Sequence, residues 1–117
     1  MSTIKDKNLA TIGQQEVDWA ARQMKVLEEI KTEFSSSKPL NGLNIGACMH
    51  VTKETANLML TLKAAGANVA LCASNPLSTK DSVAAYLSEN EIEVHAVHGV
   101  SNDDFFKHLN SVLDTKP

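Results

Sequence analysis

The chain has 117 residues, a net charge of −3 at pH 7 and 43% hydrophobic residues, which suits one domain that buries its own core. Lysine and arginine form no cluster, so the sequence offers no basic patch for nucleic acid, and no apolar run approaches the roughly 18 residues that indicate a membrane span. The first ten residues, MSTIKDKNLA, lack the apolar core of a signal peptide. We therefore expect a cytoplasmic protein that binds neither nucleic acid nor a membrane, with Cys48 and Cys72 as reduced packing residues.

Helical periodicity begins after a short lead-in. Residues 1–13 show no strong period, and we expect them to form a flexible lead-in. Over residues 14–34 the apolar side chains return at helical spacing, which predicts one N-terminal helix. A serine run followed by Pro39 ends this helix, because the position before a proline disfavours helical backbone.

Three strand–helix units follow. Short apolar runs predict buried strands at residues 43–49, 69–73 and 94–97. Helices are predicted at residues 52–65, 78–89 and 101–113, with Gly66 as a left-handed cap, Ser78 and Asp81 as a box-like start, and Ser101 as an N-cap. The alternation predicts an α/β fold: a three-layer parallel sheet, a Rossmann-like or flavodoxin-like half, preceded by an N-terminal helix.

Polar residues gather where the first two strands end. Ligands bind at the carboxyl ends of strands in such sheets, and residues 48–55 and 74–81 occupy those ends. Both segments open helices, whose free N–H groups accept oxygen atoms. The sequence has neither G-x-G-x-x-G nor a P-loop, and its only glycine there, Gly46, lies inside the strand. A neutral polar ligand such as a nucleoside therefore fits better than a bound phosphate.

Each polar candidate also has a purely structural interpretation. His50 could pack or cap at a strand end instead of binding a ligand or moving a proton. An ordinary helix start would explain Thr52 and Glu54 equally well. The remaining polar residues of these loops could also be purely structural. Capping would explain Ser78, Thr79 and Asp81, and Lys53 and Lys80 could be solvated surface residues.

The other histidines and the large aromatic residues are expected to be structural. His95 and His98 are three apart on a strand and point to opposite faces, so we do not expect a shared metal. His108 is predicted on the exposed surface of the last helix. Trp19 and Phe34 are predicted as core or interface anchors.

Three runs in order carry a resemblance to a known family. The run GACMHVTKETANLMLTLKAAGANV contains His-x-Thr-x-x-Thr-Ala after the first strand, and ASNPLSTKDSVAAYL is similar to Asn-x-(Phe or Leu)-Ser-Thr-Gln-Asp. VDWAARQMKVLEEI followed by SKPLNG resembles the opening of the same family. Over roughly residues 9–117 the chain thus resembles the S-adenosyl-L-homocysteine hydrolases, or adenosylhomocysteinases.

The resemblance implies a role for each matching residue. Thr52 and Glu54 match positions that hold the adenine end of the nucleoside, where a carboxylate accepts a hydrogen bond from the exocyclic amine. His50 matches a catalytic histidine beside the ribose, with a part in acid–base steps. Three further residues match the substrate-binding loop near homocysteine: Asn75, Ser78 and Thr79.

The chain departs from the family pattern at four positions. Lys80 stands in place of a glutamine, which puts the polarity of the homocysteine side in question. Ser74 stands where many members have cysteine, and Tyr86 replaces a small residue. Lys25 replaces a proline that follows Met24.

The family reaction is the reversible hydrolysis of S-adenosyl-L-homocysteine to adenosine and L-homocysteine, with a tightly held NAD, in a cytoplasmic enzyme that is typically a homotetramer. The resemblance implies that residues 14–117 form the N-terminal part of a truncated substrate-binding domain, without the NAD domain. The chain alone is then expected to be inactive and to bind no NAD. The alternative is a free-standing, non-catalytic module, or regulatory paralogue, that binds adenosine or S-adenosylhomocysteine. An FMN binder or phosphoryl receiver fits less well, because a receiver needs acids clustered at strand ends.

Overall fold

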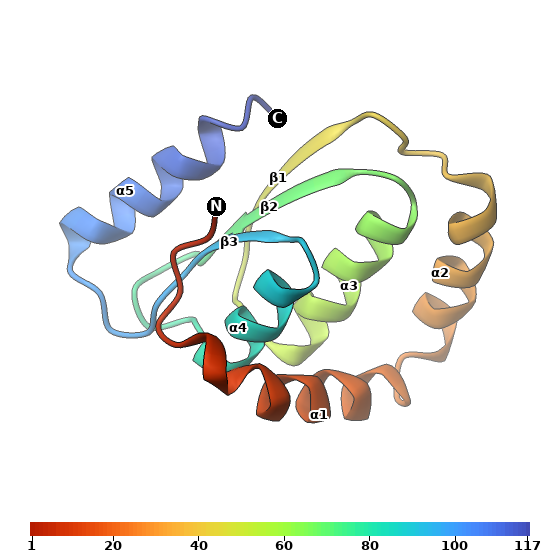
Figure 1. Ribbon diagram of the computed structural model, residues 1–117, viewed down its shortest axis with the longest axis horizontal. Coiled ribbons are helices and arrows are strands. Elements are labelled where there is room, and N and C mark those ends of the chain that lie inside the picture. The colour runs from red at the N-terminus through yellow and green to blue at the C-terminus, as the bar shows by residue number, and fades with distance from the viewer.

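Three parallel strands form the centre of the structure, a computed structural model that describes residues 1–117 (Figure 1). They are β1 (Asn44–Cys48), β2 (Asn68–Cys72) and β3 (Glu93–His95), in the order β1-β2-β3. This is the strand order of one half of a Rossmann sheet. The predicted parallel α/β fold is confirmed, and each strand lies within a residue or two of its predicted position.

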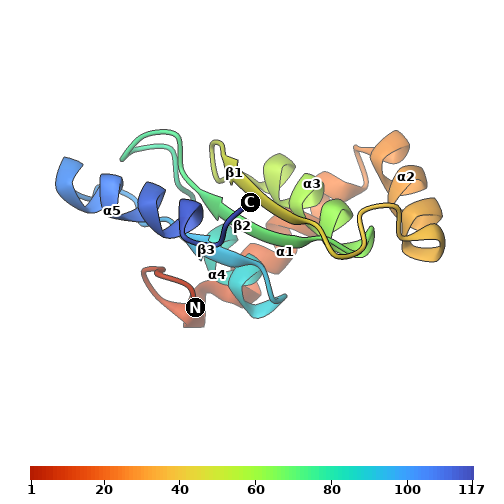
Figure 2. The same ribbon diagram turned by 90° about the horizontal axis from the view of Figure 1, so that it is seen from above.

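The two faces of the sheet are covered by different helices. Successive side chains of a strand point to opposite faces, and β2 is buried on both. Its Val69 and Leu71 belong to the main core, while Ala70 and Cys72 pack with Val112. The main core lies under α3 (Lys53–Ala64) and α4 (Asp81–Glu89), and α5 (Asn102–Leu113) crosses the opposite face and contacts all three strands (Figure 2).

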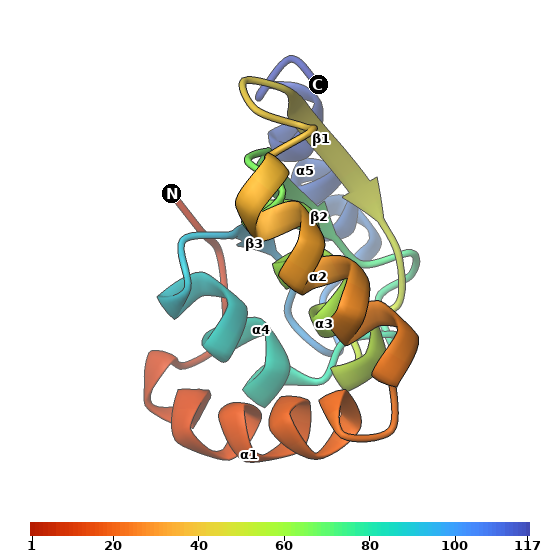
Figure 3. The ribbon, with the colours of Figure 1, turned by 90° about the vertical axis from the view of Figure 1, so that its right-hand side faces the viewer.

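Two further helices form an outer layer on the α3–α4 side. α1 (Ala10–Ala21) lies across α3 and α4, and α2 (Lys25–Ser37) packs against α3 (Figure 3). The single helix predicted over residues 14–34 is therefore wrong. α1 approaches α4 so closely that a Cβ at Gly13 would meet the carbonyl oxygen of Ser82. The chain must turn after α1 to cover α3, and this packing breaks a continuous helical pattern.

The N-terminal segment pairs with the outer edge of the sheet. Thr3 N–H donates to Val94 O at 2.8 Å, and Ala96 N–H donates to Thr3 O at 3.0 Å. A short 3-10 helix (Lys7–Leu9) then leads into α1. Regular structure thus begins before residue 14, the start indicated by periodicity. Since the segment covers β3, the exposed edge of the sheet is β1.

Helix ends match the predictions in part. Gly66 has a positive φ of 101°, as a left-handed cap requires. Ser101 accepts a hydrogen bond from Asp104 N–H at 3.1 Å and caps α5 as predicted. The box-like start at Ser78 and Asp81 is wrong, because α4 begins only at Asp81 and its N-cap makes no side-chain hydrogen bond.

Several predictions of burial need correction. His108 is 8% exposed, not a surface residue, because α5 lies flat on the sheet and turns this position inward. Trp19 is 52% exposed and is not a core anchor, whereas Phe34 is half-buried. Both cysteines are free; Cys72 is buried as predicted, but Cys48 is exposed because it lies on the open edge strand.

Candidate functional site

The loops after β1 and β2 are joined by backbone pairing. Val51 N–H donates to Ser78 O at 2.8 Å, and Lys80 N–H donates to Val51 O at 2.9 Å. These bonds form an isolated parallel bridge between Val51 and Thr79. The two polar segments that the sequence placed at neighbouring strand ends therefore form one continuous surface.

The loop after β3 joins the same rim. His98 N–H donates to the Asp81 carboxylate at 3.0 Å, and Gly99 N–H donates to Pro76 O at 2.7 Å. His98 is exposed here, while His95 is buried on β3. The carboxyl ends of all three strands are thus tied together, at the edge where ligands of parallel α/β sheets bind.

A wide hollow opens beside the start of α3. It has a volume of 630 Å³ and lies between α3 and α2. Met49, Leu58 and Ile30 supply apolar walls, and Glu54 and Thr55 supply polar groups. A hollow lined mostly by apolar side chains, with a few polar groups, is typical of a small-molecule site.

Thr52 and Glu54 have different roles in this helix start. Thr52 is the N-cap of α3, and its hydroxyl accepts a hydrogen bond from Thr55 N–H at 3.4 Å. The helix-start interpretation of Thr52 is therefore correct, and the hydroxyl is already engaged. The Glu54 carboxylate is 52% exposed and pairs with Lys53 Nζ at 3.3 Å. Glu54 thus has free acceptor capacity toward the hollow.

His50 lies on the rim next to this hollow. It is exposed, and its imidazole makes no hydrogen bond within the chain. Its carbonyl oxygen accepts from Thr52 N–H at 3.0 Å, which fixes the backbone of the loop. An unpaired imidazole at this position is free to contact a ligand.

Asn75 and Ser78 shape the second loop through local hydrogen bonds. The Asn75 side chain accepts from Leu77 N–H at 2.8 Å, while Ser78 Oγ accepts from Asn75 N–H at 3.2 Å and donates to Asn75 O at 3.1 Å. Ser74 Oγ lies 3.3 Å from Ser78 Oγ. The oxygens of Asn75 and Ser78 thus hold the turn, and the Asn75 amide N–H₂ group remains available as a donor.

The Thr79 hydroxyl caps no helix, whereas Lys80 is 63% exposed, as its surface interpretation predicts. The Thr79 hydroxyl is buried and has no hydrogen-bond partner. Lys80 Nζ lies 3.7 Å from a carboxylate oxygen of Glu16 on α1, and Ser82 Oγ donates to the other oxygen. The Lys80 ammonium is therefore directed toward α1. Sequence patterns gave no signal for Glu16, because its partners lie more than sixty positions away.

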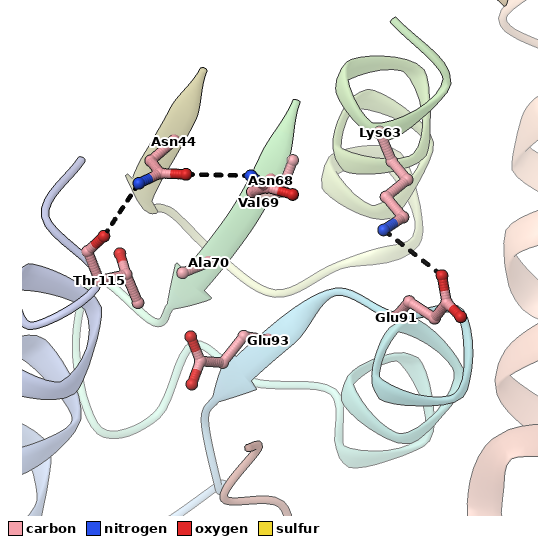
Figure 4. Close-up of a pocket in the computed structure, with 8 residues that line it drawn as sticks. All are labelled: Asn44, Lys63, Asn68, Val69, Ala70, Glu91, Glu93 and Thr115. Atoms are coloured by element: carbon pink, nitrogen blue, oxygen red, sulfur yellow. Dashed lines mark hydrogen bonds and ion pairs between the residues drawn. The ribbon is translucent and has the colours of Figure 1, made fainter. Parts of the chain in front are cut away.

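A second hollow lies at the opposite, amino end of the strands (Figure 4). Its volume is 180 Å³. Asn68 donates to the Asn44 side chain at 3.1 Å, Asn44 donates to Thr115 O at 3.3 Å, and Lys63 pairs with Glu91 at 3.5 Å. Its polar groups largely satisfy one another, so this hollow is not a candidate ligand site.

The residues of the chain do not fit a dinucleotide. The turn after β1 has no glycine for the close approach of a pyrophosphate. Gly46 serves another purpose, because a Cβ there would lie 2.9 Å from a Val112 methyl and 3.0 Å from Pro117. This glycine lets α5 and the C-terminal residues pack on β1. The structure contains no cluster of three or more metal-ligating side chains, and none of its helices has the length and apolarity to cross a membrane.

The chain is an α/β unit with a mostly apolar hollow at the carboxyl end of its parallel sheet. A sequence model of the S-adenosyl-L-homocysteine hydrolase family matches residues 1–117, and the chain belongs to that family. It is 50% identical over 115 residues to an adenosylhomocysteinase of Aquifex aeolicus, with 97% of this chain and 28% of the relative covered. It is 47% identical over 114 residues to the adenosylhomocysteinase of Sulfolobus acidocaldarius, again with 97% and 28% covered. The chain thus spans about a quarter of the length of these curated relatives.

Proposed function

We propose that the chain forms one wall of the substrate pocket of an adenosylhomocysteinase, the enzyme that reversibly hydrolyses S-adenosyl-L-homocysteine to adenosine and L-homocysteine. Residues 14–117 would be the N-terminal part of its substrate-binding domain. The observation that carries the proposal is the Glu54 carboxylate at the mouth of an apolar hollow at the strand ends.

The adenine ring is assigned to the hollow between α2 and α3. Met49 and Leu58 offer apolar contact to the ring faces. The Glu54 carboxylate accepts a hydrogen bond from the exocyclic amine of adenine, a contact that a keto-substituted purine cannot make. Thr52 supports this contact by capping α3 and fixing the first turn.

His50 is assigned to the ribose, where it moves a proton during the reaction. Its position one residue beyond Met49 places it next to the hollow, and its imidazole has no partner within the chain. An imidazole free of internal hydrogen bonds can donate or accept at a ribose hydroxyl. Ribose contact by His50 would leave the adenine contact of Glu54 intact.

The homocysteine side is assigned to the second loop. The Asn75 amide group is a free donor there, and Ser78 holds the turn that presents it. Thr79 adds to this loop a buried hydroxyl that has no hydrogen-bond partner within the chain. Lys80 replaces the family glutamine, but its contact with Glu16 turns the added charge away from this loop.

The hydride chemistry of the family belongs to NAD, and we expect these residues not to bind it, because the turn after β1 has no glycine for the pyrophosphate. We assign the cofactor site to the part of the enzyme outside these residues. A homotetrameric, cytoplasmic enzyme is part of the same proposal. The named relatives are adenosylhomocysteinases, which favours the enzyme over a free-standing binding module.

An NMR titration of the 117-residue chain with adenosine tests the proposal. Backbone amides of Met49 to Thr55 should shift at millimolar adenosine, and those beside Asn44 and Asn68 in the opposite hollow should not. Inosine, which carries a carbonyl in place of the exocyclic amine, is the matched control and should shift Glu54 less. Equal responses to adenosine and inosine would contradict the role of Glu54, and shifts confined to the opposite hollow would contradict the site.

A further inference from the structure

Two thiols lie side by side at the base of the site. Cys48 is the last residue of β1, Cys72 is the last residue of β2, and the two are partners in the parallel register. Neighbouring strands lie about 4.7–4.9 Å apart, within the Cα separation of about 4.4–6.8 Å that a disulfide requires. Paired residues of a parallel sheet point to the same face, so both thiols project toward α5.

Each thiol points toward the neighbouring strand. Cys48 Sγ donates to the carbonyl oxygen of Ala73, which follows β2, at 3.5 Å. Cys72 Sγ donates to the carbonyl oxygen of Ala47 on β1 at 3.7 Å. The two sulfur atoms therefore extend across the space between β1 and β2 and not along their own strands.

The thiols differ in access. Cys48 is exposed on the open edge of the sheet, whereas Cys72 is 1% exposed. Both line a cavity of 300 Å³ between β1 and α5, whose other walls include Leu109, Val112 and Pro117. A small oxidant can thus reach Cys48 from solvent, with Cys72 directly behind it.

We propose that Cys48 and Cys72 form a redox-responsive dithiol, which a hydroperoxide converts to an intramolecular disulfide. The Cys48 thiol gives up its proton, the thiolate attacks a peroxide oxygen and the O–O bond breaks; Cys48 becomes a sulfenic acid, and the departing hydroxide or alkoxide takes up a proton and leaves as water or an alcohol. Cys72 then attacks the Cys48 sulfur. The S–O bond breaks, the thiol proton of Cys72 joins the departing hydroxide as water, and an S–S bond forms. Each disulfide consumes one hydroperoxide.

The order of these steps follows from the two environments. Burial, and after it the nearby Cys48 thiol, raises the pKa of Cys72 to about 12. At neutral pH Cys72 therefore keeps its proton and is a poor first nucleophile, because the thiolate is the reactive form. Cys72 acts only in the second step, where the sulfenic sulfur is held next to it and its proton passes to the departing hydroxide as it attacks.

The disulfide would join the two strands directly below the site. Cys48 lies two residues before His50, and Cys72 lies three residues before Asn75. Oxidation would therefore add a covalent link at the base of the two polar loops, which the Val51–Thr79 backbone bridge already joins. The proposal does not depend on which ligand the loops bind.

Oxidation of the wild-type chain by hydrogen peroxide tests the proposal. After stoichiometric peroxide, both free thiols should be lost in thiol counting, and the intact mass should fall by two hydrogen atoms. A nonreducing peptide map should contain a Cys48–Cys72 cross-link, and dithiothreitol should restore both thiols. Sulfinic acid at Cys48 with Cys72 still a free thiol would overturn the proposal, as would a dimer linked through two copies of Cys48 or an absence of oxidation.

Two single variants separate the roles of the thiols. Cys72→Ser should leave a sulfenic acid at Cys48 that dimedone traps, because the resolving thiol is gone. Cys48→Ser should lose most reactivity toward peroxide, since Cys72 is buried. Rapid oxidation of Cys72 in the Cys48→Ser variant would contradict the assigned order, and circular dichroism verifies that both variants are folded.

Discussion

Val51 and Thr79 form a backbone bridge that joins the loop after β1 to the loop after β2. Val51 is fully buried, and its N–H and C=O groups bond to residues on either side of Thr79. Backbone bonds of this kind keep two loops at a fixed separation without constraining the side chains around them. The adenine side and the homocysteine side of the proposed pocket therefore form a single rigid unit.

We expect that removal of the Thr79 hydroxyl stabilises the chain. It is buried without a hydrogen-bond partner, and a buried unsatisfied polar group costs about 1–3 kcal/mol. Thr79→Val removes the hydroxyl and keeps the shape, so the free energy of unfolding should rise by about 1 kcal/mol. Urea denaturation followed by circular dichroism measures this change.

Thr61→Val is the matched control. Thr61 is equally buried, but its hydroxyl donates to Asn57 O at 2.8 Å. The same substitution there removes a satisfied hydrogen bond and should leave stability unchanged or lower. If Thr79→Val destabilises the chain as much as Thr61→Val does, the Thr79 hydroxyl has a partner in solution and the assignment fails.

Glu54 is expected to recognise the adenine amine. In a chimera that carries this chain in place of the matching segment of the Aquifex aeolicus relative, Glu54→Ala should weaken adenosine binding by about 1–3 kcal/mol, the cost of an unpaired buried partner. Calorimetry measures the change. Glu33→Ala, which removes an exposed carboxylate on α2, should have no effect. Equal affinities of the Glu54→Ala and parent chimeras would reject the contact.

His50 is expected to act in proton transfer. In the same chimera His50→Ala should lower kcat by about 10²–10⁴, the usual contribution of a positioned acid or base. Circular dichroism and bound NAD should be unchanged, because the imidazole makes no hydrogen bond within the chain. Loss of turnover accompanied by loss of folded structure would instead favour a structural role for His50.

The free energy of unfolding should decrease as the pH falls through the ordinary titration range of histidine, and we assign this decrease to His108. Burial, and after it the nearby His95, lowers the pKa of His108, and Asp104 on its own helix opposes the shift. The unfolded chain therefore binds a proton at a higher pH than the folded chain, and protonation favours unfolding below the ordinary pKa of about 6.5.

His108→Gln should flatten this dependence in urea denaturation between about pH 7.5 and pH 5.5, the range around the ordinary imidazole pKa. His98→Gln is the control, since His98 is exposed on the loop after β3. If the free energy of unfolding depends on pH in the same way in His108→Gln and in the wild type, another group causes the loss of stability. Glu93 does not contribute to the pH dependence in this range. The hydrogen bond from the N-terminal amine holds its pKa below the usual range, so its protonation lowers stability only in more acid solution.

The sheet was predictable because its signals are local. Each strand is a short apolar run, and each crossover helix starts and ends at residues with a known local preference, such as Ser101 and Gly66. Parallel order follows from alternation alone. The position of the two polar loops at one edge of the sheet follows in turn, so the candidate site was also predictable.

The errors come from contacts between distant segments. The break between α1 and α2 has no glycine or proline to mark it. Lys25 occupies the first position of α2, where the resemblance implies a proline, a residue that favours a helix start. His108 lies on the same helical stripe as Phe105 and Val112, and that spacing could have indicated its burial. The contact of Glu16 with Lys80 carries no such local signal.

The 117-residue chain by itself should not hydrolyse S-adenosyl-L-homocysteine. It has no glycine turn for NAD after β1, and Gly46 is occupied by packing against Val112. A coupled assay for homocysteine release with added NAD should give only background. Adenosine should bind weakly, with a Kd on the order of millimolar, because the hollow beside Glu54 is open on one side and encloses little of the ligand. Turnover above background would refute the proposal that the NAD site lies outside these residues.

The same chain should self-associate, and this is the last prediction. Large apolar side chains are exposed on several helices and loops: Val26 by 72%, Leu77 by 70%, Leu113 by 65% and Phe106 by 59%. Phe106 and Leu113 lie on the same helix, α5, and line the same cavity, and a contiguous apolar patch promotes association in water. Sedimentation velocity should show a mass that rises with concentration, and Phe106→Ser, on α5, should reduce it. Monomers at all concentrations, together with micromolar affinity for adenosine, would favour a free-standing binding module over a wall of a larger pocket.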